Sequence, residues 1–206
     1  MVAMSYGSEA EGKGRGMDDD EPVFFANVRN LRNWLVSKEI PVDRWGVGQA
    51  KQVDDLWSEL ETGESVLTDP PPRRRVAVVS VVVRRGDAVL TEVAQLLATG
   101  ATRTRQLPPS EKMHPGEEAE TAAYRCAWEE MGIPRESCRI VPGRQTEASR
   151  VAESPSYPGL VTLYRMNQVE MAIPDLPDTA FSTAESDRSQ DATVKIHYWD
   201  WRTDTL

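Results

Sequence analysis

Glu117, Arg125, Glu129 and Glu130 are the residues of this chain whose types and spacing could do chemistry. Arg125 and Glu129 are four residues apart, so their side chains meet on one face of a helix. Glu130 follows directly. Carboxylate oxygens are the ligands that Mg²⁺ and Mn²⁺ prefer, and an arginine beside them can orient them. The segment is therefore a candidate for holding a divalent metal against a diphosphate.

The residues around this set predict a helix over 118–131. The segment is rich in Ala and Glu, which are strong helix formers, and Gly132 supplies the stop. Small side chains allow close packing on a sheet: Ala119, Ala122, Ala123 and Ala127. An isolated glutamate pair is more often a solvent-facing feature of a helix. That alternative does not explain the tight loop over 114–117 that leads into the helix.

The segment over 111–133 resembles the Nudix box, the signature of hydrolases that cleave a nucleoside diphosphate linked to another group. The box is a Gly, five residues, a Glu, seven residues, then Arg-Glu-apolar-any-Glu-Glu-any-Gly. Counted back from Gly132, the chain matches at Glu117, Arg125, Glu129 and Glu130. It departs at Glu111, where the box opens with Gly, and at Cys126, where a Glu follows the Arg.

The resemblance implies an α+β fold, an α/β/α sandwich with a mixed sheet. It implies Mg²⁺ or Mn²⁺ as cofactor and a small nucleotide-type molecule as substrate. Glu129 and Glu130 would hold the metal, Glu117 would assist, and Arg125 would orient the carboxylates. By analogy with a family whose domains often pair, a homodimer is possible.

The two departures weaken this expectation and leave a second hypothesis open. A thiol at Cys126 is a poor ligand for Mg²⁺, and it is more readily interpreted as a small buried apolar residue than as a reactive group. Glu111 would restore the missing charge as a metal ligand if its carboxylate points inward. The alternative function is a catalytically inactive Nudix-like module that binds a nucleotide or a protein.

Four residues outside the helix are candidate substrate contacts: Arg105, His114, Glu153 and Tyr157. Arg105 brings positive charge for a phosphate, although such an arginine is more often a solvated strand end. The segment over 153–159 is a rigid loop between two strands. Tyr157 within it either stacks on a ligand ring or packs against its own loop, with even weight on each. Glu147 and Glu153 are candidates for an extra metal ligand or a general base, and His197 is interpreted as structural.

The chain divides into three predicted parts. Residues 1–21 are Gly-rich and charged, which predicts a disordered tail. Residues 22–69 predict a helical hairpin, with apolar residues at helical spacing over 23–38 and 49–62. Such a hairpin is too short to be stable alone and should dock on the main domain.

Residues 73–206 form the predicted Nudix-like domain. Its Val-rich first strand has the composition of a central strand, and a turn at Gly86-Asp87 predicts a hairpin with the second. The expected strands cover 75–84, 88–97, 102–105, 138–141, 144–153, 160–171 and 193–201.

Composition limits the partners and the compartment. The formal charge of -9 argues against general binding to nucleic acid, although a local basic rim can still hold a small anion. Two cysteines fit a reducing compartment. No apolar run approaches the roughly 20 residues of a membrane span, and no signal-peptide core is present. We expect a soluble intracellular protein with no membrane partner, in the cytoplasm or in an organelle stroma or matrix.

Overall fold

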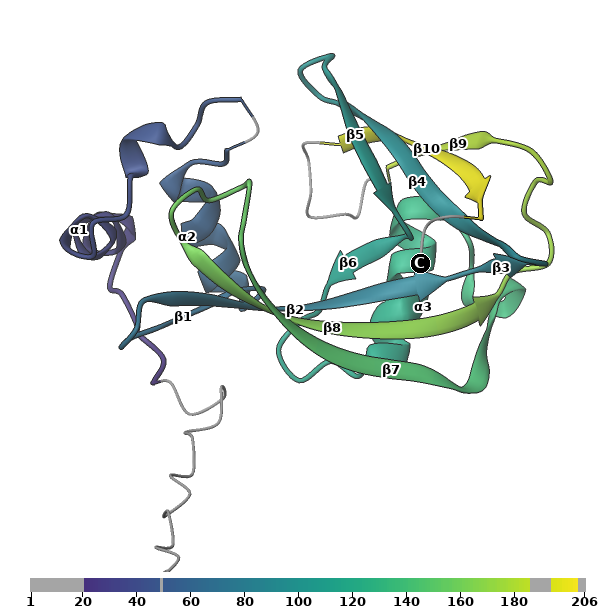
Figure 1. Ribbon diagram of the computed structural model, residues 1–206, viewed down its shortest axis with the longest axis horizontal. Coiled ribbons are helices and arrows are strands. Elements are labelled where there is room, and N and C mark those ends of the chain that lie inside the picture. The colour runs from purple at the N-terminus through teal and green to yellow at the C-terminus, as the bar shows by residue number, and fades with distance from the viewer. Residues whose placement is uncertain (1–20, 49, 186–193, 204–206) are drawn as a thin grey trace, which may run out of the picture.

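The computed structural model describes residues 21–48, 50–185 and 194–203. Over these residues, two five-stranded sheets and three α-helices are formed (Figure 1). The predicted tail over 1–21 lies outside the described residues, except for Glu21. None of the helices in the described ranges is long and apolar enough to cross a membrane.

The first sheet is mixed. At its centre β2 (Arg73–Val82) runs parallel to β8 (Val161–Ala172), and β7 (Arg139–Glu153) pairs antiparallel with β8. On the other edge of β2 lie two short antiparallel strands, β1 (Val66–Thr68) and β6 (Ser110–Lys112). The α+β prediction with a mixed sheet is confirmed, and the Val-rich run is a central strand as predicted.

The second sheet is wholly antiparallel. Its strands are β3 (Arg84–Arg85), β4 (Ala88–Leu97), β5 (Thr102–Leu107), β9 (Phe181–Ala184) and β10 (Val194–Arg202).

The predicted hairpin at Gly86-Asp87 is wrong for most of its length. β2 and β4 lie in different sheets, and only the two residues of β3 pair with β4. The reason is that β8 takes one edge of β2 while β1 and β6 take the other. No edge of β2 is left for β4.

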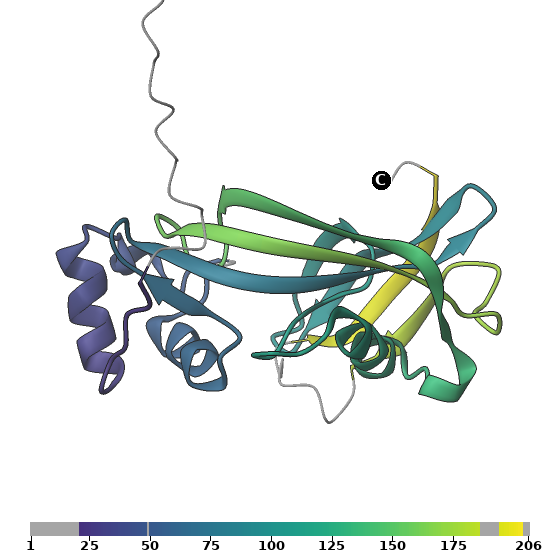
Figure 2. The same cartoon turned by 90° about the horizontal axis from the view of Figure 1, so that it is seen from below.

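Helix α3 (Ala119–Met131) packs against both sheets, contacting β2, β6 and β8 of the first and β9 of the second (Figure 2). Gly132 ends it in the left-handed conformation, with φ of 69°. The alanines allow α3 to pack closely on the sheets, as predicted, since Ala122, Ala123 and Ala127 are fully buried. The core of the domain gathers around this helix, with Val79, Leu90 and Trp199 among its members.

The N-terminal extension contains α1 (Val28–Ser37), a short 3₁₀ helix η1 (Val42–Arg44) and α2 (Val53–Thr62). Both α-helices start later than predicted because their caps lie inside the predicted ranges. Asn27 caps α1, and Gln52 and Asp55 form a capping box on α2.

The extension is docked on the sheet, at one end of the long strands β2, β7 and β8 (Figure 1). β1 extends the first sheet. Leu31, Leu56 and Leu67 share a second core with Leu160, which directly precedes β8. This agrees with a hairpin that needs the rest of the chain, while its boundary at residues 69–73 stays a prediction.

Two strand assignments differ from expectation. The strands expected over 138–141 and 144–153 are one strand, β7, with a register shift between Ile140 and Gln145. β6 was not predicted, because three residues between a Pro-Pro pair and a Pro-Gly loop carry too little pattern to mark a strand. A second short 3₁₀ helix, η2 (Arg135–Ser137), links α3 to β7.

The contact between the end of α2 and the box loop can be tested at Gly63. A Cβ on Gly63 would lie 2.3 Å from Cγ of Pro115, and Gly63 has φ of +77°. Gly86 also has positive φ, but a Cβ there meets nothing within 4 Å. The left-handed conformation costs a non-glycine residue about 1–2 kcal/mol. We expect Gly86→Ala to lose about that much stability in urea unfolding and Gly63→Ala to lose clearly more. Equal losses would mean that the contact with Pro115 contributes nothing.

Candidate functional site

Arg125 is the centre of the box, where its guanidinium joins the helix to the preceding loop. It binds Glu117 through two hydrogen bonds (Nε to Oε1, 3.1 Å; Nη2 to Oε2, 3.0 Å) and Glu129 through one (Nη1 to Oε2, 3.0 Å). Nη2 also donates to the carbonyl oxygen of Lys112 at 2.6 Å. Glu117 in turn accepts from the backbone N–H of His114 at 2.9 Å. Three of the matching box residues are thus joined in one ion-pair network.

The network fixes the charge of Glu117. Burial opposes ionisation, but the hydrogen bonds from Arg125 and from the backbone of His114 lower the pKa of Glu117. Its carboxylate is therefore an ionised, oriented group, as the resemblance implied for a residue that assists a metal site. His114, predicted as a substrate contact, contributes its backbone N–H to this network.

Glu130 is buried on the face of α3 that meets the sheets, with only 6% of its surface exposed. Its Oε2 has no hydrogen-bond partner among the described residues. Burial first, then repulsion from Glu92 and Glu111, raise the pKa of Glu130 well above its ordinary value. A buried carboxylate oxygen without a partner is costly, and such a group calls for an explanation.

Glu111 brings its carboxylate to the same region from β6, which packs against α3. One of its oxygens accepts from the backbone N–H of Lys112 at 2.8 Å. Burial raises the pKa of Glu111 to about 7, with Arg125 acting in the opposite direction. The charge of Glu111 also raises the pKa of both Glu130 and Cys126. Glu111 therefore acts on the helix face that carries the two box positions Cys126 and Glu130.

Cys126 is fully buried in the core. Burial, followed by the negative charge of Glu130, raises the pKa of its thiol well above the ordinary value. A buried thiol with a raised pKa is inert as a nucleophile. The interpretation of Cys126 as a small apolar core residue agrees with this environment.

A second charged cluster lies beside Glu130 on the antiparallel sheet, and sequence reasoning missed it. The protonated imidazole of His197 donates from Nδ1 to Glu92 at 2.5 Å and from Nε2 to Glu185 at 2.6 Å. Burial alone would lower the pKa of His197, but these two carboxylates raise it to about 10. This buried and paired environment agrees with the interpretation of His197 as structural. The sequence feature that could have indicated Glu92 is its position as a charged residue within the apolar strand β4.

Arg105 belongs to this second cluster. Its Nε donates to Oε2 of Glu92 at 3.0 Å, across neighbouring strands of the second sheet. Arg105 and His197 together lower the pKa of the buried Glu92. Arg105, which was predicted to contact a substrate phosphate, is therefore paired with the carboxylate of Glu92.

Two of the proposed substrate contacts lie away from the box. Tyr157 is fully buried, where its hydroxyl donates to Glu59 at 3.0 Å and its ring packs on Trp45 at 5.1 Å. Of its two interpretations, packing is the observed one, because burial of the ring and a partner for the hydroxyl stabilise this loop. Glu153 accepts from the N–H of Gly159 at 2.6 Å.

Glu153 also stands far along β7 from the box. Glu153 pairs with Val161 on β8. Six residues further along β8, Asn167 pairs with Val79 on β2, and Val79 pairs with Glu111 on β6, in one row across the sheet. At about 3.3 Å per residue, six residues are roughly 20 Å. Glu147, by contrast, pairs with Asn167 in that row, and it binds Arg165 at 2.9 Å.

The donor chemistry of the box fits a divalent cation. Glu111, Glu129 and Glu130 offer carboxylate oxygens, and Oε2 of Glu130 is a buried oxygen that accepts no hydrogen bond from the described residues. Among residues 21–48, 50–185 and 194–203, no three His, Cys, Asp or Glu side chains are already arranged to hold a metal ion. The carboxylate of Glu129 is hydrogen-bonded to Arg125. To bind a cation, the Glu129 side chain would have to give up this hydrogen bond.

The N-terminal extension reaches the box through a buried carboxylate on α2. Glu59 is 5% exposed, and five groups contact its carboxylate. They are Ser65, Arg74, Tyr157, Lys51 and Lys112. Lys112 binds Glu59 at 2.6 Å and Glu64 at 2.8 Å, while its own carbonyl accepts from Arg125. One residue thus connects α2 to the central arginine of the box.

The NUDIX domain family model matches residues 71–196. The chain belongs to the Nudix family. The match covers the box, α3 and every strand of the two sheets except β1 and most of β10, and it starts at the end of the helical extension. No curated protein sequence matches the chain.

Among solved structures, the chain is similar to a Nudix hydrolase from Nitrosomonas europaea, with 18% identity and a TM-score of 0.37 over 61% of this chain and 72% of the other. An Ap4A hydrolase binary complex from C. elegans has 16% identity and a TM-score of 0.33, over 62% and 77%. The Nudix hydrolase RenU from M. smegmatis has 19% identity and a TM-score of 0.32, over 65% and 78%.

The buried Glu59 cluster predicts a pH-dependent stability. Burial would raise the pKa of Glu59, but Arg74 and Lys112 hold it far below its ordinary value of 4.5. The pKa is lower in the folded state, so the contribution is present above pH 4.5 and is lost as the pH falls below it. Breaking a buried ion pair costs about 3–5 kcal/mol. We expect Glu59→Gln to lose about that much at pH 7 in urea unfolding.

The difference between Glu59→Gln and the wild type should shrink as the pH is lowered from 5 to 3. Glu61→Gln, an exposed position on the same helix, is the control and should follow the wild type at every pH. A Glu59→Gln deficit that stays constant between pH 7 and pH 3 would contradict the assignment of an ionised Glu59.

Proposed function

We propose that the chain is a metal-dependent Nudix-type hydrolase of a nucleoside diphosphate linked to another group. The observation that carries this proposal is the unpartnered buried oxygen of Glu130, together with the negative charge of Glu111 that acts on it. Carboxylates gathered in a buried site are stabilised by a cation, and Mg²⁺ and Mn²⁺ take such oxygen ligands. Glu111, Glu129 and Glu130 are the proposed ligands.

The remaining box residues have supporting roles in this proposal. Arg125 fixes the carboxylates of Glu117 and Glu129 and joins them to the loop carbonyl at Lys112. Glu117 stays ionised and adds negative charge beside the proposed ligands. A divalent metal held by these carboxylates would polarise the phosphate group and lower the pKa of a water molecule, which could then attack phosphorus as the bond from phosphorus to the leaving oxygen breaks.

A polar hollow supports a nucleotide-type substrate. It measures about 190 Å³ and lies beside Ala119 at the start of α3. Its walls carry the amides Gln145, Asn167 and Gln168, which both donate and accept hydrogen bonds, as the edge of a base does. Asn167 stands in the same row of the first sheet as Val79 and Glu111. A base in the hollow would leave its diphosphate near the box loop.

A catalytically inactive nucleotide-binding module is the second candidate. Cys126 favours it, because a buried thiol stands where the box supplies a carboxylate. The engagement of Glu117 and Glu129 by Arg125 favours it as well. In this case the fold and the hollow would bind a nucleotide without turnover. A homodimer stays a prediction under both candidates.

The two candidates are separated by a hydrolysis screen. Nucleoside diphosphate derivatives are incubated with Mg²⁺ or Mn²⁺, and released phosphate-containing products are measured. We expect metal-dependent turnover in the wild type. Glu130→Gln, which removes a proposed ligand charge while keeping the shape, should lower the rate by about 100-fold or more.

Glu118→Gln is the matched control, because Glu118 is the exposed N-cap residue of α3 and makes no side-chain capping bond. It should keep the wild-type rate. No turnover of any compound, together with no shift in melting temperature on adding either metal, would contradict the enzyme proposal. Full activity of Glu130→Gln would mean that Glu130 is not a ligand.

A further inference from the structure

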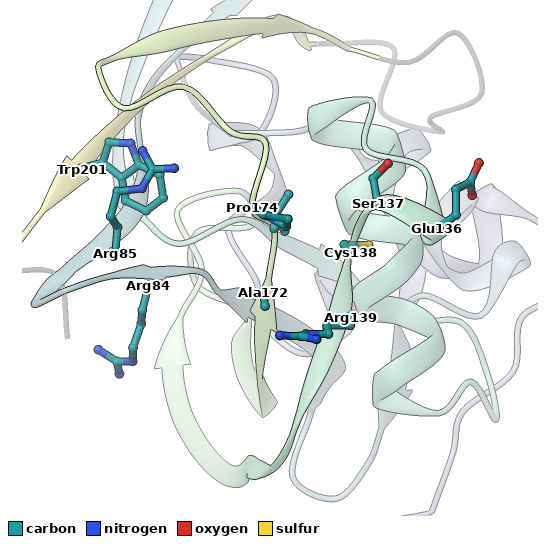
Figure 3. A pocket seen from close by; sticks show the side chains of 10 residues that line it. Arg84, Arg85, Glu136, Ser137, Cys138, Arg139, Ala172, Pro174 and Trp201 are labelled. Atoms are coloured by element: carbon teal, nitrogen blue, oxygen red, sulfur yellow. The ribbon is translucent and has the colours of Figure 1, made fainter.

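A second cavity lies on the far side of α3 from the N-terminal extension, and the Nudix box does not line it. It measures about 440 Å³, within the range of about 300–1,000 Å³ typical of small-molecule sites. Its walls come from β3, from η2 and the start of β7, from the end of β8 and from β10 (Figure 3). It is larger than the polar hollow beside Ala119.

One wall carries a positive charge without a matching carboxylate. Arg139 is exposed, and its guanidinium makes no hydrogen bond or ion pair with the described residues. Its side chain extends from β7 toward Ala172 (Figure 3). Glu136 is the acidic residue of this lining, and its carboxylate points away from Pro174 in the same view. Arg139 is therefore available to an anion that enters the cavity.

The opposite wall is a rigid pair formed by Arg85 and Trp201. The guanidinium of Arg85 lies 4.3 Å from the centre of the indole ring and donates to the carbonyls of Leu176 (3.0 Å) and Pro177 (2.8 Å). The indole N–H of Trp201 also donates to Pro177, at 2.9 Å. Groups held in this way lose little further freedom when a ligand binds.

Apolar side chains complete the lining between the two walls. They are Cys138, Ala172, Ile173 and Pro174. The combination is apolar surface with charged groups at its borders, which suits a molecule that is part hydrocarbon and part anion. Arginines match phosphate oxygens with their planar fork of donors.

Arg84, Arg85 and Arg139 border the cavity, and this charge favours a dianion. Arg84 is held by Glu170 at 3.3 Å and Arg85 by Asp178 at 2.6 Å. The Asp178 side chain is 89% exposed, so solvent screens that pair and leaves part of the field of Arg85 in the cavity.

We propose that this cavity binds a small phosphate monoester with a flat apolar body. The phosphate binds Arg139, and the apolar body lies against Pro174 and the indole edge of Trp201. The site is separate from the Nudix box and does not depend on the function proposed for it.

Phenyl phosphate is the probe, titrated into the full chain by calorimetry with EDTA present, so that metal at the box plays no part. Inorganic phosphate and phenol are titrated in parallel. We expect saturable binding of phenyl phosphate, at least about tenfold tighter than either fragment, since the anion and the ring use different walls.

Three variants test which residues bind the probe. Arg139→Gln should weaken phenyl phosphate by about 10–100-fold, as loss of a hydrogen bond to a charged group does. Arg150→Gln, an exposed arginine on the same strand outside the cavity, should bind like the wild type. Trp201→Leu should weaken phenyl phosphate while leaving inorganic phosphate unchanged.

Absence of saturable phenyl phosphate binding in the wild type would overturn the proposal. So would equal weakening by Arg139→Gln and Arg150→Gln, which would indicate attraction to general surface charge. Glu130→Gln should bind phenyl phosphate normally, so a failure of this site and a failure of the enzyme proposal give different results.

Discussion

The ion pair between Arg125 and Glu117 organises the rest of the box. Through the same guanidinium, Arg125 also holds Glu129 and the carbonyl of Lys112, so one side chain joins the helix, the loop and β6. Lys112 then extends the connection to Glu59 on α2. A charge network of this kind positions the carboxylates of Glu117 and Glu129 without a ligand. It also makes the N-terminal helices part of the structure that supports the box.

The chemistry of the site depends on which positions of the box carry carboxylates. The box lacks a carboxylate at Cys126 and has one at Glu111 instead. β6 packs against α3, and the negative charge of Glu111 raises the pKa of the Cys126 thiol. The thiol of Cys126 belongs to the apolar core, and Glu111 brings a carboxylate from β6 to the same helix. The proposed function rests on this exchange.

The sequence predicted the elements that carry strong local patterns. The Ala-rich helix, its glycine stop and the Val-rich central strand were predicted correctly because composition and periodicity act within a few residues. The division of the strands between two sheets could not be predicted, because it depends on which edges of β2 are already taken.

The same limit applies to the site residues. Arg125, Glu117 and Glu129 meet because helical spacing and a tight loop bring them together, which is local information. Glu59 contacts Lys112 over a long chain separation, and Tyr157 finds its partner on α2 rather than in a ligand. Contacts that depend on tertiary packing cannot be predicted from the residue spacing within either segment.

The central claim is that Glu111 supplies the carboxylate that Cys126 lacks. It is tested most directly by the affinity for Mn²⁺ of four proteins: wild type, Glu111→Gly, Cys126→Glu and the double variant that restores the family pattern. We expect Glu111→Gly to weaken Mn²⁺ binding by about tenfold or more, and Cys126→Glu in the same chain to recover it. Unchanged affinity in Glu111→Gly, with the fold intact by melting temperature, would contradict the claim.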